Sequence, residues 1–368
     1  MPATTRGRLR QQALLDLPLD DNMLVHVLAA LNVHHGTEAL DRASGVCRSW
    51  RDRVLDSAHL EDDPDSMIGE LRSGDKPYRF DRPHDAIFLP NGHVCVADCD
   101  NFRMQIVSRD GYYVGEVRLD GGTSCPTGLA ASGDWLYVVE HGAHRLSKLR
   151  RSCTSAAETT SRAKRWACVG SWGGGDAELR HPWGVAVANK RVYVTDQGND
   201  RICVFSADKL DFLFSFGGRG GGMGQLREPR GLAIDGEELF VADSRNHRIV
   251  VYSLAKAANG EVQPARCYGG GESSTRGRFG LPSGVCIANG RLYVTELTNH
   301  RVQVLSLDRG LPLQVLKADG PVSGVCADST HVCTTSLDGD HAITLWRVNA
   351  TPRSSSMMMA SGRGLMPP

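Results

Sequence analysis

The residues most able to do chemistry in this sequence are acids and arginines that recur together. An aspartate or glutamate is followed five residues later by an arginine at five places. The pairs are Asp98 and Arg103, Glu140 and Arg145, Asp196 and Arg201, Asp243 and Arg248, and Glu296 and Arg301. Charged partners of this kind could bind a ligand or take part in catalysis. A spacing that repeats five times favours a structural role instead, because the acid would end one strand, the arginine would open the next, and the loop between them needs its polar groups satisfied.

No other motif predicts catalysis or a bound metal. The 13 histidines are scattered, and the sequence contains neither His-Glu-x-x-His nor a Cys and His zinc cluster. It has no Gly-x-Ser-x-Gly elbow, and its glycine clusters lack the Lys-Ser/Thr of a phosphate-binding loop. We therefore expect a protein that is not an enzyme, with no metal and no cofactor.

The acid and arginine pairs lie in a segment that repeats along the chain. Copies begin at Pro83, Pro126, Pro182, Pro229 and Pro282, and a decayed sixth copy lies around Gly324. Each copy, such as PRGLAIDGEELFVADSRNHRIVVY, holds three short strands rich in β-branched and aromatic residues, and a fourth apolar run usually follows. Starts spaced 40 to 56 residues apart suit a four-stranded propeller blade, so six copies predict six blades.

The two ends of this repeat region are expected to pair. The sixth copy stops at its third strand, Ala342–Val348, and Met67–Arg72 resembles the missing fourth strand. Pairing of the two would close the ring and remove the edges that an open stack of blades exposes. The expected propeller therefore covers residues 67–348 and is closed by the strand at 67–72.

The repeats resemble the NHL family, whose motif begins with Pro-x-Gly, continues with a strand ending in Val-x-Asp, and then reads Asn-His-Arg-Ile. Asn246–Ile249 and Asn299–Val302 are the most specific matches. Asp85 replaces the motif glycine in the first copy, Ala143 replaces the asparagine in the second, and the sixth copy departs further. The resemblance implies a mainly β fold, a six-bladed NHL-type β-propeller.

Residues 14–60 follow a different pattern, with the apolar spacing of short amphipathic helices. Leu17–Leu31 and Leu40–Asp56 resemble an F-box, including its Ala-Ser-x-Val-Cys-Arg-x-Trp element. The resemblance implies a small α-helical F-box-like domain that docks on the small adaptor subunit of a cullin-based ubiquitin ligase. The adaptor-binding residues would be Leu17, Pro18, Val27, Leu28, Val46, Cys47 and Trp50. The alternative for this segment is a helical cap on the propeller.

The chain as a whole has the composition of a globular protein. Its 368 residues carry 42 basic and 42 acidic side chains, which argues against a dedicated nucleic-acid binder or a polybasic membrane anchor. No apolar run is long enough to span a membrane. The cysteines lack a zinc or thioredoxin spacing, and Cys95, Cys203, Cys286 and Cys326 fall in apolar strands where a free thiol acts as a small hydrophobe. We expect a reducing compartment, cytoplasmic or nuclear, with disordered ends at 1–13 and 349–368 and a linker at 61–66.

The NHL resemblance also implies which face of the propeller binds a substrate. By analogy with the family geometry, the loops joining fourth to first and second to third strands share one face, which points away from the F-box-like domain. Residues that vary among the repeats on this face are candidate substrate contacts. They are His84, Phe102, His144, Trp183, Asp200, Arg230, His247 and His300. Trp183 is the best single candidate, as an exposed aromatic beside the channel, and the alternative is that all eight line solvated turns.

Together these features predict the substrate-recognition subunit of a cullin-based, SCF-type ubiquitin ligase. Its partners would be the adaptor, the cullin and an undetermined protein substrate, with no membrane. Two alternatives remain open. One is an NHL propeller that regulates by binding RNA, and the other is a protein-interaction scaffold without a ubiquitin function.

Overall fold

The computed structural model describes residues 66–69, 74, 76–119, 124–150, 165–169, 175, 177–337 and 341–347, with the backbone alone at 165–169. The expected F-box-like domain at 14–60, with all seven of its adaptor-binding residues, lies outside the described residues. So do the expected disordered ends at 1–13 and 349–368. The structure therefore addresses the propeller part of the prediction.

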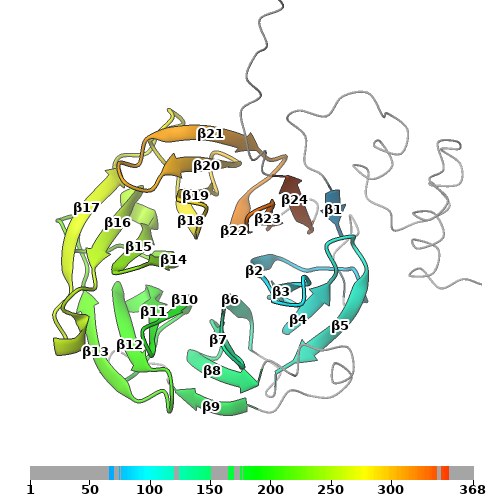
Figure 1. The fold of residues 1–368 in the computed structure, drawn as a ribbon, viewed down its shortest axis with the longest axis horizontal. Coiled ribbons are helices and arrows are strands. Elements are labelled where there is room, and N and C mark those ends of the chain that lie inside the picture. Colours follow the sequence, from blue (N-terminus) through cyan, green and yellow to red (C-terminus); the bar gives the residue numbers. More distant parts are fainter. Residues whose placement is uncertain are drawn as a thin grey trace, which may run out of the picture.

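Six four-stranded sheets stand radially around a central axis (Figure 1), so the predicted six-bladed propeller is confirmed. Blade 1 contains β2 (Pro83–Phe88), β3 (Val94–Asp98), β4 (Arg103–Val107) and β5 (Tyr113–Arg118), and blade 2 contains β6 (Pro126–Ser132), β7 (Trp135–Glu140), β8 (Arg145–Arg150) and β9 (Arg165–Val169). Blade 3 contains β10 (Pro182–Ala188), β11 (Arg191–Asp196), β12 (Arg201–Ser206) and β13 (Phe212–Gly217), and blade 4 contains β14 (Pro229–Asp235), β15 (Glu238–Asp243), β16 (Arg248–Ser253) and β17 (Gln263–Gly269). Blade 5 contains β18 (Pro282–Ala288), β19 (Arg291–Glu296), β20 (Arg301–Ser306) and β21 (Pro312–Lys317), and blade 6 contains β22 (Val322–Ala327), β23 (His331–Ser336), β24 (Ile343–Arg347) and β1 (Ser66–Ile68). Within the described ranges the helical elements are three short 3-10 turns, η2 (Gln197–Asn199), η3 (Ser244–Asn246) and η4 (Ala257–Asn259).

Each blade starts at the axis and ends at the rim, and every strand pairs antiparallel with the next. The core lies between blades. Tyr137 and Val139 of blade 2, for example, pack with Val192 of blade 3, and all three side chains are nearly inaccessible to solvent. The middle strands are continuously buried because each is covered on both faces by neighbouring blades, which explains their uninterrupted apolar composition.

Blade 6 is completed by the two ends of the described chain. β1 pairs antiparallel with β24, with Ser66 opposite Leu345 and Ile68 opposite Ile343. β1 begins one residue earlier than expected, inside the predicted linker, and its described pairing covers Ser66–Ile68. Residues 70–72 of the expected strand lie outside the described residues. Ile68 is buried in the same apolar cluster as Ile343 and Leu345, so the closing strand also covers part of the core.

The inner strands approach one another most closely at a ring of glycines. A Cβ added at any of them would lie 2.4 to 2.6 Å from a backbone carbonyl oxygen of the next blade. These positions are Gly128, Gly184, Gly231, Gly284 and Gly324. The sixth position holds Asp85, whose carboxylate accepts the backbone N–H of Leu129 in blade 2 at 2.9 Å. The motif glycine is therefore required because two backbones come too close together for a side chain. At the junction between blades 1 and 2, where Asp85 stands in place of the glycine, its carboxylate joins the two blades through a hydrogen bond.

Removing residues 1–69 should expose the edge of β24 and the apolar side chains that Ile68 covers. An unpaired strand edge promotes association between molecules, so we expect this truncated protein to aggregate. Removing residues 1–60 leaves β1 in place and should leave the propeller monomeric. Size-exclusion chromatography of the two proteins distinguishes these outcomes, and identical behaviour would show that β1 is dispensable for closure.

Candidate binding face

The five repeat pairs form ion pairs at the start of the third strand of blades 1 to 5. The shortest nitrogen to oxygen distance in each lies between 2.6 and 2.8 Å, and each acid is 0% exposed. In blade 4, Asp243 accepts hydrogen bonds from Arg248 Nε, from the Asn246 amide and from the backbone N–H of Arg227, at 2.7 to 2.8 Å. Arg248 also donates to the carbonyl oxygens of Gly222 and Gln225. The pair therefore anchors the loop that precedes its own blade to the turn between the second and third strands.

We use the term upper face for the side that carries these turns and the loops preceding each first strand. The residue before the third strand has a left-handed backbone in blades 1 to 5, and three of the predicted substrate contacts occupy this position with an acceptor side chain. His144 Nδ1 accepts the backbone N–H of His181 at 3.0 Å, and Asp200 accepts that of Glu228 at 2.7 Å. His247 likewise accepts the N–H of Leu281 at 3.3 Å. These three side chains join neighbouring blades, a contact that the sequence analysis did not anticipate.

Phe102 and His300 occupy the same turn position in blades 1 and 5, and both side chains are exposed. Phe102 cannot accept a hydrogen bond, so it does not join blades 1 and 2 in the way that His144, Asp200 and His247 join theirs.

Blades 1 and 2 are instead joined by a disulfide. Its two residues are Cys99, which follows β3, and Cys125, which precedes β6. The disulfide was not predicted, because 26 residues separate the two cysteines and no sequence pattern pairs them. Cys95, Cys203, Cys286 and Cys326 are free thiols as expected.

The channel mouth is covered by a cluster of aromatic and cationic side chains. The indole of Trp183 in blade 3 contacts the imidazole of His84 in blade 1, with ring centroids 4.7 Å apart. His141, which follows β7, contacts the same indole at 5.6 Å, and the Arg230 guanidinium lies 4.5 Å from the indole centroid. We call these four residues the mouth cluster.

The structure corrects two expectations about the mouth cluster. Trp183 is half-buried instead of exposed, because it packs against side chains from three blades. His84 is 4% exposed and makes an edge contact with the indole, so it supports Trp183 and has almost no surface to offer a partner. Arg230 and Trp183 both remain partly accessible at the mouth.

Burial controls the charge of the mouth cluster. It lowers the pKa of His84 to about 3, and the nearby Arg82, Arg230 and His141 add to this effect. It also lowers the pKa of His141 to about 4, with further contributions from His181 and His144. At neutral pH the two imidazoles are therefore uncharged, and Arg230 supplies the positive charge of the cluster.

Acidification should destabilise the propeller through His84. The folded protein binds this proton less well than the unfolded chain, whose histidine has a pKa of 6.5, so stability falls as the pH drops below about 6.5. At pH 5 the expected loss is about 2 kcal/mol relative to pH 7. His141 and Asp85 also titrate between these pH values, so urea unfolding of the unmodified protein and of His84→Gln at both pH values isolates this contribution. The change from pH 7 to pH 5 should be about 2 kcal/mol less unfavourable in His84→Gln. An equal loss in His84→Gln would assign the pH dependence to other groups.

A polar hollow of about 540 Å³ lies beside the mouth cluster on the upper face. Its walls are formed by His141, Arg180, His181, Gln197, Gly198, Asp200, Arg219, Arg227 and Glu228. His141 belongs to both the hollow and the mouth cluster, so the two are continuous. His141, His181 and Arg227 were not among the predicted site residues, although each stands within two residues of a repeat acid or a motif proline.

Below the mouth, the inner strands line a channel of about 360 Å³. Asp85 faces this channel, and burial raises the pKa of its carboxyl to about 7 despite the hydrogen bonds from two backbone N–H groups. Burial also raises the pKa of the Cys286 thiol to about 12. The rest of the channel wall is mostly small apolar side chains and glycine. The channel therefore offers one titratable carboxyl in narrow, largely apolar surroundings.

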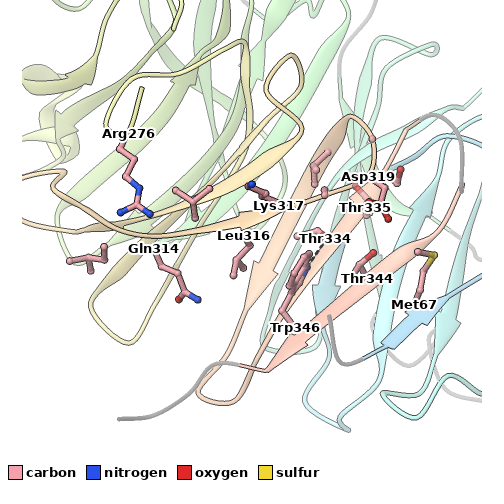
Figure 2. Close-up of a pocket in the computed structure, with 16 residues that line it drawn as sticks. Met67, Arg276, Gln314, Leu316, Lys317, Asp319, Thr334, Thr335, Thr344 and Trp346 are labelled. Carbon is pink, nitrogen blue, oxygen red and sulfur yellow. Dashed lines mark hydrogen bonds between the residues drawn. The ribbon is translucent and has the colours of Figure 1, made fainter. Parts of the chain in front are cut away.

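A third hollow, of about 600 Å³, lies on the outside between β21 and blade 6 (Figure 2). Figure 2 shows Leu316 of β21 on one side, and Trp346 of β24 and Met67 of β1 on the other. The indole N–H of Trp346 donates to Thr334 Oγ1 at 3.3 Å. β21 has six residues and β1 only three, so the short closing strand leaves this flank of blade 6 open. None of the predicted site residues lines this hollow.

Within the described part of the chain, one group of side chains has the spacing of metal ligands, namely Cys99, Asp100 and Cys125. Its two sulfur atoms are bonded to each other, so they are not available as a pair of thiolate ligands. Among the described residues no helix is long and apolar enough to cross a membrane.

The NHL repeat is the sequence family that matches, at residues 80–107, 179–205, 226–252 and 279–305. No curated protein matches the chain in sequence. Among solved structures, a gluconolactonase from Xanthomonas campestris is similar with a TM-score of 0.55 and 17% identity over 80% of this chain and 99% of that one. A streptogramin B lyase has a TM-score of 0.51 and 13% identity, over 77% of this chain and 87% of the lyase. A protein from Bacteroides thetaiotaomicron has a TM-score of 0.56 and 14% identity, over 77% of this chain and 75% of that protein. Identities this low show the fold alone. The chain therefore carries NHL repeats and folds as a six-bladed β-propeller.

Proposed function

We propose that the protein is a non-catalytic receptor that captures a protein substrate for a cullin-based ubiquitin ligase. The NHL propeller is suited to protein interaction, and its upper face would hold the substrate. The observation that carries this proposal is the mouth cluster, where a half-buried indole and a cationic guanidinium meet beside a polar hollow. Tryptophan and arginine are the residue types most enriched among those that dominate binding energy at protein interfaces.

The second half of the proposal rests on sequence. The F-box-like segment at 14–60, with Val46, Cys47 and Trp50 in its most specific element, would dock on the adaptor subunit. The chain would then connect substrate and ligase without an active site of its own.

Affinity purification of the full chain and two variants tests both halves. Trp50→Ala should lose the adaptor and the cullin while keeping substrate proteins, because it removes the aromatic side chain of the adaptor contact. Trp183→Ala combined with Arg230→Glu should lose substrate while keeping the adaptor. Thermal melting of each variant checks that the propeller remains folded. Retention of every partner by the second variant would reject the upper face as the substrate site.

RNA binding is the second candidate, since Arg180, Arg219 and Arg227 are exposed along the hollow. Two acids, Asp200 and Glu228, share the same wall, so the hollow is not the uniformly basic groove that follows a phosphate backbone. Ribonuclease treatment before purification separates the candidates, because partners held through RNA would be lost.

A further inference from the structure

We propose that the upper face binds an acidic segment of its protein partner, with one carboxylate paired to Arg230. This inference rests on the proposed function, since it names the chemistry of the substrate that the face would take. It starts from the surroundings of Arg230 and not from the fold.

The Arg230 guanidinium makes no ion pair at contact distance among the described residues, although the Glu228 carboxylate acts on it at longer range. The Nε of Arg230 is buried without a hydrogen-bond acceptor. Its guanidinium instead stacks on Trp183, 4.5 Å from the ring centroid. Arg230 as a whole is partly accessible, so a ligand would pair with its terminal N–H groups and not with the buried Nε.

The acids nearby are engaged elsewhere. Glu228, two residues before Arg230, forms an ion pair with Arg245 at 3.0 Å. Asp200 accepts the backbone N–H of Glu228 at 2.7 Å and joins blades 3 and 4. Either carboxylate would have to give up one of these contacts to reach Arg230. The missing acceptor is thus more readily supplied from outside the chain.

The chemistry of Arg230 favours a carboxylate. A guanidinium presents N–H donors in a planar fork that fits both oxygens of a carboxyl group, and stacking on the indole fixes the plane of this fork. Beyond it, the hollow of about 540 Å³ offers Arg219 and Arg227 to the next residues of an extended peptide. Arg227 has no ion pair among the described residues, whereas Arg219 lies 3.9 Å from Asp200.

A nucleic acid fits the same surface less well. Binding of single-stranded RNA commonly uses an aromatic face on which a base can stack. Here the Arg230 guanidinium occupies one side of the Trp183 indole, and the rings of His84 and His141 make edge contacts with it. Little aromatic surface is left for a base, so the observations favour a peptide.

The probe is the peptide 5-carboxyfluorescein-Gly-Glu-Glu-Gly-Glu-Glu-Gly-amide, titrated with the full chain at low salt and followed by fluorescence anisotropy. Its isostere with glutamine at all four glutamates is the matched negative peptide. We expect saturable binding of the glutamate peptide and at least tenfold weaker binding of the glutamine peptide. Arg230→Gln should weaken the glutamate peptide at least tenfold, and Arg230→Lys should fall between, since lysine keeps the charge without the fork.

Arg309→Gln is the matched control, because it makes the same change at an arginine that is 77% exposed in the loop between β20 and β21, on the opposite face. It should bind the peptide as the unmodified protein does. Absence of saturable binding, or equal affinity in Arg230→Gln, overturns the inference. A labelled uridine dodecamer that binds through Arg230 while the glutamate peptide does not would overturn it in favour of RNA.

The outcomes also separate this inference from the proposed function. If the upper-face variant loses its protein partners but the glutamate peptide does not bind, the face is a substrate site of different chemistry. If that variant keeps every partner, the proposed function fails whatever the peptide does.

Discussion

Replacing Asp243 with alanine should lower the free energy of unfolding by about 3 to 5 kcal/mol. The carboxylate is 0% exposed and accepts hydrogen bonds from Arg248, Asn246 and the backbone of Arg227. Its removal would leave the Arg248 guanidinium, only 12% exposed, without its counter-charge. Urea unfolding of the two proteins measures the difference.

Two comparisons sharpen this test. Glu261→Ala removes one member of an exposed pair with Lys256, whose side chains are 57% and 73% exposed, and should cost under about 1 kcal/mol. Asp243→Ala combined with Arg248→Met should recover part of the loss, because the double change no longer leaves a buried charge unpaired. Near-normal stability in Asp243→Ala with loss of a binding partner would contradict the structural role.

Replacing Gly231 with alanine should destabilise the propeller by about 3 kcal/mol. The added Cβ would lie 2.4 Å from the carbonyl oxygen of Ser283 and 2.9 Å from the Cα of Gly284, both backbone atoms of blade 5. No side chain can rotate to make room, so two blades must separate at the axis.

Gly236→Ala is the control for this substitution. A Cβ at Gly236 would meet nothing within 4 Å, although its φ of +55° adds a conformational cost of about 1 kcal/mol. Thermal melting of the two variants compares them. Near-normal stability in Gly231→Ala would contradict this explanation of the inner ring, since Gly231 has no positive φ that would otherwise require glycine.

The repeat explains why so much of the fold could be predicted. Strand ends recur at the same motif positions, so the second and third strands of blade 4 were located by residues such as Asp243 and Arg248. The closing strand was located by its likeness to another outer strand, but its first residue was not. The described pairing of β1 covers Ser66–Ile68 and begins one residue before the sequence resemblance does.

The site was harder to predict because its contacts join different repeats. His84 and Trp183 lie in blades 1 and 3, and no local pattern shows that their rings meet. His144 and Asp200 were predicted to contact a substrate because the residue type at their position differs from one repeat to the next. In the structure they make equivalent bonds to the next blade, since either side chain can accept a backbone N–H. The repeat motif predicts where a residue lies within its own blade. Its contact with the next blade depends on which residue that blade places opposite it.

The pairing of β1 with β24 has a consequence for how the protein folds. β1 is the first described strand to leave the ribosome and β24 is the last, so blade 6 cannot be completed until all the other described strands have been made. Contacts between residues this far apart in sequence require a large loop to close, which slows folding. Until then β1 and the open flanks of the growing propeller are exposed to other chains. The closing strand thus makes the finished ring continuous while delaying its completion, and this interval is when protection by chaperones would matter most.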